Sequence, residues 1–219
     1  MVVYFNLVIF VQQNKRDMKK LLKFGNQTVE IIQDTDSENP RNWDNLGTCL
    51  FFGKHSHLGD EHDIDAEDYI SFDEMKKDLI KNRGVAVIIP VYMYSHSGIT
   101  IKTTPFGDRW DSGQLGFIVA YKAQLRDEYN VKRISKKLID KVSLYLTGEI
   151  ETLDQYINGE VYGFNHTDES GEDIDSCYGF YGDSAENGIF DQIDIAGLTF
   201  EDYKKEFDSA EWSENECMA

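Results

Sequence analysis

Two short polar segments that interrupt an apolar, β-forming region contain the residues best suited to acid–base chemistry. Residues 84–121 are rich in Val, Ile, Tyr and Phe, and His96 and Asp111 lie in the two interruptions. If both lie at the same end of a sheet, Asp111 can orient the imidazole of His96 as a general base, beside Ser112 and Gln114. Serine, aspartate and glycine are also typical of tight turns without any function. The alternative interpretation is therefore that these are turn residues.

A second group of polar side chains precedes that region. His55, His57, Asp60 and His62 follow the pattern His-x-His and then Asp-x-His. Imidazole and carboxylate groups are ligands of zinc and manganese, so a divalent metal is the one cofactor that the sequence suggests. The segment has no helical or strand periodicity that would hold four ligands on one side. A polar surface loop without metal is the alternative.

The sequence lacks the motifs of the commonest enzyme classes. It contains no phosphate-binding loop, dinucleotide fingerprint, nucleophile elbow, zinc-peptidase motif or Cys-x-x-Cys. This absence favours a non-enzymatic protein. The alternatives are a metal-dependent hydrolase or a small-ligand or nucleotide-binding protein that uses the His96 and Asp111 loops. A nucleotide binder would need a basic pocket, for which Arg109 and the lysines of 132–141 are the candidates.

Charge is distributed unevenly along the chain. The net charge is −18, and residues 149–219 account for all of it, with 20 Asp and Glu against two Lys, whereas residues 1–148 hold 20 of each sign. An acidic surface repels nucleic acid and anionic membranes and attracts basic partners. We expect a protein partner with a basic surface, and neither direct nucleic-acid nor membrane binding; the sequence specifies no oligomeric state. A solubilising surface without a partner is the alternative. The candidate partner-binding residues are Asp168, Glu169, Glu172, Asp173, Asp175, Asp183, Glu186, Asp191 and Asp194.

The N-terminus and the cysteines bear on the compartment. Residues 1–17 begin with an apolar run that is too short to span a membrane, and their positive charges follow this run, whereas those of a signal peptide precede it. We expect these residues to be either a buried strand or an extension before Met18. Three widely spaced cysteines fit a reducing cytoplasm better than a disulfide framework.

Periodicity and turn signals predict an α+β fold, with a mixed or antiparallel sheet of about five to seven strands and two or three packed helices. The expected organisation is a single domain over 18–190, followed by an acidic C-terminal helix and tail over 191–219. Capping signals at Ser71 and Thr199 predict helix starts, and Thr147-Gly148 is expected to interrupt a helix that begins near Ile134. Strands are expected at 27–33, 49–52, 161–166 and 176–182, with three more in 84–121.

Six short motifs in combination resemble a family of small acidic proteins found in bacteriophages and prophages. They are Trp43-Asp-Asn-Leu-Gly-Thr48, His96-Ser-Gly-Ile99, Trp110-Asp-Ser-Gly-Gln114, Gly116-Phe-Ile118, Tyr162-Gly-Phe164 and Cys177-Tyr-Gly-Phe-Tyr-Gly182. The resemblance covers about residues 27–190. It implies a genetic setting, a phage-encoded protein in the host bacterial cytoplasm, and no particular activity. Combined with the charge, it predicts a protein that binds and inhibits a host protein, as an anti-defence factor or a nucleic-acid mimic.

Overall fold

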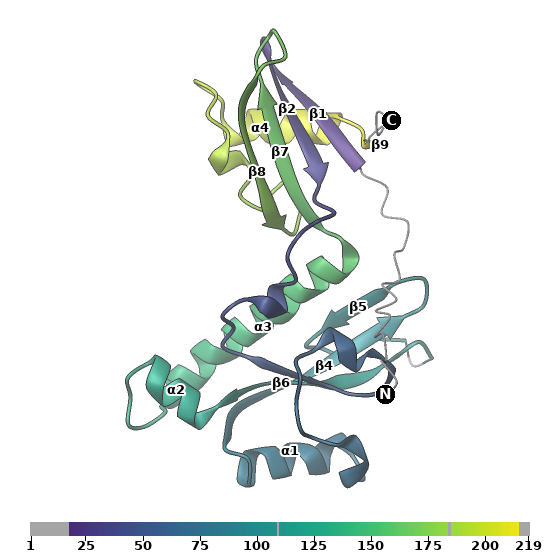
Figure 1. Cartoon of the computed structure of the whole chain (residues 1–219), viewed down its shortest axis with the longest axis vertical. Coiled ribbons are helices and arrows are strands. Elements are labelled where there is room, and N and C mark those ends of the chain that lie inside the picture. Colours follow the sequence, from purple (N-terminus) through teal and green to yellow (C-terminus); the bar gives the residue numbers. More distant parts are fainter. Residues whose placement is uncertain (1–17, 109, 184, 215–219) are drawn as a thin grey trace, which may run out of the picture. The chain divides into compact units, whose positions relative to one another are not determined.

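The chain folds into two compact units with separate sheets (Figure 1). The computed structural model describes residues 18–108, 110–183 and 185–214. The terminal unit combines the chain up to Asp36 with the chain from Val161, and the central unit is Ser37–Glu160. This differs from the single domain expected over 18–190, because the first hairpin pairs with strands that follow residue 160. The expected extension over 1–17 lies outside the described residues.

The terminal unit contains an antiparallel sheet of five strands in the order β8-β7-β2-β1-β9. β1 and β2 form a hairpin around Gly25, whose φ of 66° suits a tight turn. β2 also pairs with β7, which places Ile31 opposite Phe164. The predicted hairpin of β7 and β8 is present. The strands are β1 (Met18–Phe24), β2 (Gln27–Gln33), β7 (Val161–Thr167), β8 (Asp173–Tyr181) and β9 (Ser213–Glu214).

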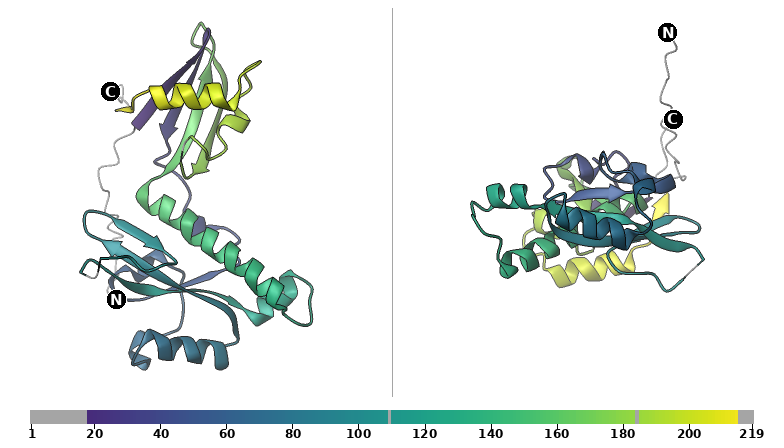
Figure 2. Two further views of the ribbon diagram at one scale, coloured as in Figure 1. Left: turned by 180° about the vertical axis from the view of Figure 1, so that it is seen from behind. Right: turned by 90° about the horizontal axis from the view of Figure 1, so that it is seen from below.

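Helix α4 (Phe200–Ser209) covers one face of this sheet, as Figure 2 shows. The predicted cap is confirmed, since the Thr199 hydroxyl accepts from the Asp202 backbone N–H. Tyr203 and Phe207 are buried against the sheet, together with Leu22 and other strand residues. The C-terminal segment is therefore part of the core of the terminal unit, and differs from the appended helix and tail that the sequence suggests. A short 3₁₀ helix, η4 (Phe190–Gln192), precedes α4.

The central unit contains an antiparallel sheet of four strands in the order β3-β6-β4-β5. The three strands predicted within 84–121 are confirmed, and β6 is the strand that is covered on both faces, with residues 115–120 all buried. Pro90 lies in β4 outside the segment that pairs with β5, so a residue without an N–H is tolerated there. The strands are β3 (Thr48–Phe51), β4 (Val85–Ser95), β5 (Ile99–Lys102) and β6 (Ser112–Tyr121).

Helices α1 and α3 pack on opposite faces of the central sheet. Leu79 of α1 contacts the cluster that contains Phe117, whereas Leu146 of α3 contacts the cluster that contains Ile118. The interruption expected at Thr147-Gly148 is absent, because buried residues before and after Gly148 continue one apolar face. The helices are α1 (Phe72–Lys81), α2 (Lys122–Glu128), α3 (Lys136–Asn158) and the 3₁₀ helices η1 (Pro40–Asn42), η2 (Gly53–Leu58) and η3 (Ala66–Asp68).

Within the described part of the chain, no helix combines the length and apolar character needed to cross a membrane.

Candidate functional site

The residues predicted for acid–base chemistry do meet. The backbone N–H of Ser95, at the end of β4, donates to the Asp111 carbonyl at 2.8 Å and so joins the two loops. His96 Nδ1 lies 3.1 Å from Asp111 Oδ2. The His96 side chain is 67% exposed. Asp111 therefore orients an imidazole that remains open to water.

The neighbours of this pair are engaged in local structure. The Ser112 hydroxyl donates to the Asp108 carbonyl, and the Gln114 amide donates to the Gly116 carbonyl at 3.1 Å. Trp110 is 96% exposed and does not shield the pair from water. The described residues of these loops therefore contain a base with an orienting carboxylate, but no buried nucleophile or oxyanion site beside it.

A pocket of about 330 Å³ brings together residues from both predicted clusters. Asp111, Ser112 and Gln114 line it from one strand end, and Lys54 and His55 line it from η2. Burial lowers the pKa of His55, so its imidazole is neutral near pH 7. Its Nδ1 atom is buried without a hydrogen-bond partner among the described residues. A sequence pattern cannot predict that η2 and the start of β6 line the same pocket, because only the tertiary fold brings these two segments together.

The four candidate metal ligands occupy different environments. Asp60 is bound to Arg41, while His62 Nε2 lies 3.1 Å from the Phe51 carbonyl. The rings of His55 and His57 are 6.0 Å apart. Among the residues that the structure describes, no group of three or more His, Cys, Asp and Glu is arranged to hold a metal ion.

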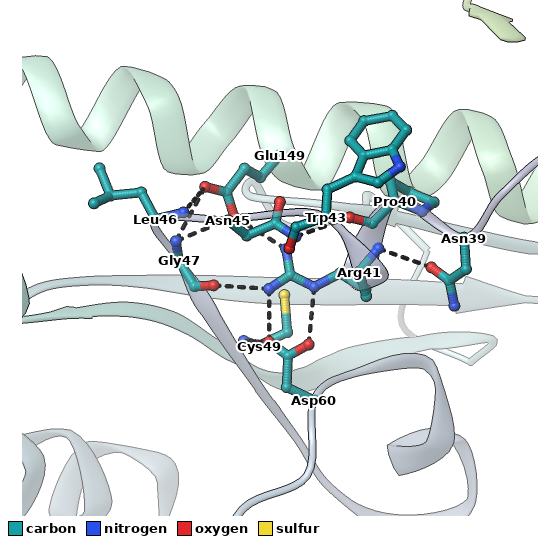
Figure 3. A network of polar contacts seen from close by, with 10 residues as sticks. All are labelled: Asn39, Pro40, Arg41, Trp43, Asn45, Leu46, Gly47, Cys49, Asp60 and Glu149. Atoms are coloured by element: carbon teal, nitrogen blue, oxygen red, sulfur yellow. Dashed lines mark hydrogen bonds and ion pairs between the residues drawn. The ribbon is translucent and has the colours of Figure 1, made fainter.

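The most extensive polar network of the central unit surrounds Arg41, a residue that the sequence does not single out (Figure 3). The Arg41 side chain is only 7% exposed. Its Nε and Nη2 donate to the two carboxylate oxygens of Asp60 at 3.1 and 2.6 Å, and its Nη1 donates to Glu149 Oε2 at 3.0 Å. Nη2 also donates to the Gly47 carbonyl at 2.7 Å. Burial alone would lower the pKa of Arg41, but the hydrogen bond to Asp60 raises it above its ordinary value.

Both carboxylates of this network have further backbone donors. Glu149 accepts from the N–H groups of Leu46 and Gly47, and Asp60 accepts from that of Cys49 at 2.7 Å. A Cβ on Gly47 would lie 2.7 Å from Leu146 and 2.8 Å from Glu149 Oε2, so glycine is required for this close approach. The network is satisfied internally, and we assign it a structural role: it ties η1, β3 and α3 together.

The candidate partner-binding acids all lie in the terminal unit. This unit carries 20 Asp and Glu against 7 Lys and Arg, which is −13, whereas the central unit carries 20 against 15, which is −5. Asp168 builds the β7–β8 turn: hydrogen bonds from Ser170 and Glu172 lower the pKa of its carboxyl group.

The remaining acids divide by their contacts. Asp183 accepts from the Ala185 N–H, Glu186 pairs with Lys204, and Glu169 accepts from Asn26. Among the described residues, the exposed acids to which we assign no such role are Glu172, Asp173, Asp175, Asp191 and Asp194. The Asp175 carboxylate accepts from the N–H of the next residue.

The basic residues near the start of α3 behave differently from expectation. The sequence suggests that Lys132, Arg133, Lys136, Lys137 and Lys141 pair with carboxylates of the chain itself, yet none of the ion pairs found among the described residues involves them. Lys141 instead lies over the Tyr129 and Tyr145 rings at 5.1 and 5.3 Å.

Comparison with protein-family models, curated proteins and solved structures finds no match to this chain.

Proposed function

We propose that this chain is a phage-encoded acidic protein of the host cytoplasm that binds a host protein with a basic surface and inhibits it. The observation that carries the proposal is the −13 charge of the terminal unit, which exposes carboxylates along the β7–β8 hairpin and the segment that follows. Such carboxylates can occupy a groove that otherwise binds the phosphates of nucleic acid. Anti-defence activity is the biological role that fits a phage protein of this kind.

The charge pattern favours a protein partner for a physical reason. No Lys or Arg occurs between residues 142 and 203, so the hairpin and the loop after it present negative charge without local compensation. The turn at Asp168 is held by hydrogen bonds, which keeps the hairpin tip in a defined conformation. A preorganised field attracts a basic partner at long range and repels nucleic acid.

The test begins with purification of the protein and its partner from infected bacterial cells, followed by binding of the purified pair at increasing salt. We expect the affinity to fall steeply between about 50 and 500 mM salt, because the Debye length shrinks from about 14 to 4 Å. A complex whose affinity is unchanged over this range would contradict the proposal.

Point substitutions are preferable to a deletion of residues 190–219, because Tyr203 and Phe207 belong to the core of the terminal unit. The test variant neutralises five exposed acids of this unit: Glu172→Gln, Asp173→Asn, Asp175→Asn, Asp191→Asn and Asp194→Asn. The matched control removes the same charge from exposed positions of the central unit: Glu61→Gln, Glu67→Gln, Asp68→Asn, Glu128→Gln and Glu151→Gln. We expect only the first variant to lose binding; equal loss in both would mean that net charge alone matters.

A second candidate function is suggested by the pocket that joins His55 to Asp111. A small polar ligand could bind there, with Lys54 providing positive charge and His55 lining the same wall. Screening of small anions and nucleotides by chemical shift changes in the full chain tests this possibility. Shifts confined to Lys54, His55 and Asp111, and lost in His55→Ala, would support it.

Metal analysis of the purified protein tests the hydrolase alternative. A stoichiometric metal that disappears in His55→Ala or His62→Ala would favour an enzyme, whereas retention of the metal in both variants would exclude these histidines as ligands.

A further inference from the structure

Strand β8 forms one edge of the sheet in the terminal unit (Figure 1). Among the described strands it pairs only with β7, and its residues from Asp173 to Gly179 are all exposed. Near the end of the strand, the Phe180 carbonyl accepts a hydrogen bond from the Asn187 side chain. The described part of the chain therefore covers the last residues of β8 but leaves the segment 173–179 open.

The backbone of this segment offers hydrogen-bonding groups to solvent. The Ser176 N–H donates to the Asp175 carboxylate at 2.8 Å, so it does not take part in the ladder with β7. Cys177 lies opposite Phe164 in that ladder. The ladder shifts register on both sides of the pairs made by Asp175, Ser176 and Cys177, so regular alternation holds for these three residues, and Ser176 is the one whose N–H and carbonyl face the open edge. An exposed edge of this kind is a template for another strand.

The charge of the side chains beside the edge determines which kind of strand can bind there. Glu172, Asp173 and Asp175 line it, and the nearest Lys or Arg in the sequence is Lys141 or Lys204. A second copy of this chain would place like charges opposite each other, which disfavours self-association through β8. An extended segment with Lys or Arg at alternate positions would instead pair its charges with these carboxylates.

The Tyr178 side chain lies across the face of the sheet next to this edge. Tyr178 lies over Gly163, where a Cβ would approach its ring to 2.2 Å, and its hydroxyl donates to the Asn165 side chain at 2.9 Å. This contact braces β8 against β7, so the edge is ordered before a partner arrives. Strand addition to a preformed edge costs less conformational entropy than pairing of two flexible segments.

We propose that the edge of β8, from Asp173 to Gly179, binds an extended basic segment of the partner as an additional strand of the sheet. The inference rests on the function proposed above and specifies how the partner is held: backbone hydrogen bonds supply geometry and the carboxylates supply charge selection. Asp175 releases the Ser176 N–H to the incoming carbonyl and pairs with a cation of the added strand.

A pair of peptides with identical charge separates strand addition from plain electrostatic attraction. The probe is a peptide of about nine residues that alternates Lys and Val, the length of a long strand. The matched peptide is N-methylated at its three central residues, which removes donors on both edges without a change in charge. Binding of each to the full chain is measured by fluorescence polarisation in a reducing buffer at low salt.

We expect the methylated peptide to bind at least about ten-fold more weakly, since it loses one or two donors that face β8, at about 1 kcal/mol each, and its methyl groups also keep the two backbones apart. Hydrogen exchange at the Ser176 amide should slow when the unmodified peptide is bound. Equal binding of the two peptides would overturn strand addition but leave an electrostatic function intact. Absence of binding by both would overturn strand addition, and the salt test with the purified partner would then decide the proposed function separately.

Two variants provide an independent check. Ser176→Pro removes the outward N–H, and Ser176→Ala retains it. We expect Ser176→Pro to abolish the preference for the unmodified peptide and Ser176→Ala to preserve it. Asp175→Asn keeps an acceptor for the Ser176 N–H but removes the negative charge. It should therefore weaken the binding of both peptides by the same factor. A Ser176→Pro variant that keeps its fold and still prefers the unmodified peptide would contradict the proposal.

Discussion

Arg41 and Glu149, which are 108 residues apart in sequence, form an ion pair with a 3.0 Å distance between Nη1 and Oε2. Arg41 also binds Asp60, so one guanidinium joins two carboxylates in a largely buried position. The motif Trp43-Asp-Asn-Leu-Gly-Thr48 lies around this network: Asn45 donates to the Pro40 carbonyl at 2.8 Å, and the backbone at Gly47 binds both Arg41 and Glu149. This motif thus has a structural role in the central unit.

Replacement of Arg41 tests the structural role of this network. Arg41→Ala would leave Asp60 and Glu149 buried near each other without a cation, so we expect the free energy of unfolding of the central unit to fall by about 3 kcal/mol. Urea unfolding followed by tryptophan fluorescence in a Trp212→Phe background measures it. Arg83→Ala is the control, because the pairs of Arg83 with Asp63 and Asp78 are exposed. A loss in Arg41→Ala no larger than in Arg83→Ala would contradict the assigned role.

Two glycines of the central unit should respond to alanine in opposite directions. A Cβ at Gly47 would collide with Ile118, Leu146 and Glu149, so Gly47→Ala should destabilise by about 1–3 kcal/mol. Gly148 lies inside α3 with no atom within 4 Å of the added Cβ, and Gly148→Ala should stabilise by about 0.5–1 kcal/mol. Denaturant titration of both variants checks the signs, and a gain in stability for Gly47→Ala would refute the packing argument.

The two described cysteines should differ in reactivity. Burial raises the pKa of the Cys49 thiol to about 12, whereas Cys177 is exposed. In a Cys217→Ser background at pH 8, alkylation should modify Cys177 readily and leave Cys49 unmodified until the central unit unfolds. Peptide mapping by mass spectrometry measures both sites over time.

The same shift has a consequence for stability at high pH. A thiol with a raised pKa stays neutral in the folded state while the unfolded chain ionises, so its contribution is complete below the unfolded pKa of about 8.5 and is lost as pH rises toward about 12. The fall in unfolding free energy between pH 9 and 11 should be shallower in Cys49→Ala than in the parent. Equal slopes would show that the thiol does not titrate differently in the two states.

The C-terminal helix should behave as part of the core. Phe207 packs with Leu22 and Tyr203, so Phe207→Ala should lower the stability of the terminal unit by about 3–5 kcal/mol. Hydrogen exchange resolves the two units: amides of β1 and β2 should exchange faster, and those of β4 and β6 should be unchanged. Phe200→Ala is the control, because Phe200 is 41% exposed and should have a smaller effect. Unchanged exchange in β1 and β2 would show that α4 is an appended helix and does not belong to the core.

Features of the fold that depend on neighbouring residues could be predicted from sequence. The caps at Ser71 and Thr199 and the strands within 84–121 follow from residues a few positions apart, and the structure contains each of them. The break expected at Gly148 is absent because the buried face of α3 stabilises the helix by more than the low helix propensity of one glycine disfavours it.

Part of the candidate site could also be predicted. The contact between His96 and Asp111 follows from two loops at the same end of one antiparallel sheet. The approach of His55 to the same pocket does not, because no periodicity relates η2 to the end of β6.

Sequence by itself determined the local elements, the acidic excess and its position toward the C-terminus, because each depends only on the order of residues along the chain. Tertiary structure alone decided the division into two units, the partners of Arg41 and the open edge of β8. These depend on which distant segments pair and pack. A strand becomes an edge, and a charged residue becomes buried, only through the position of every other element around it.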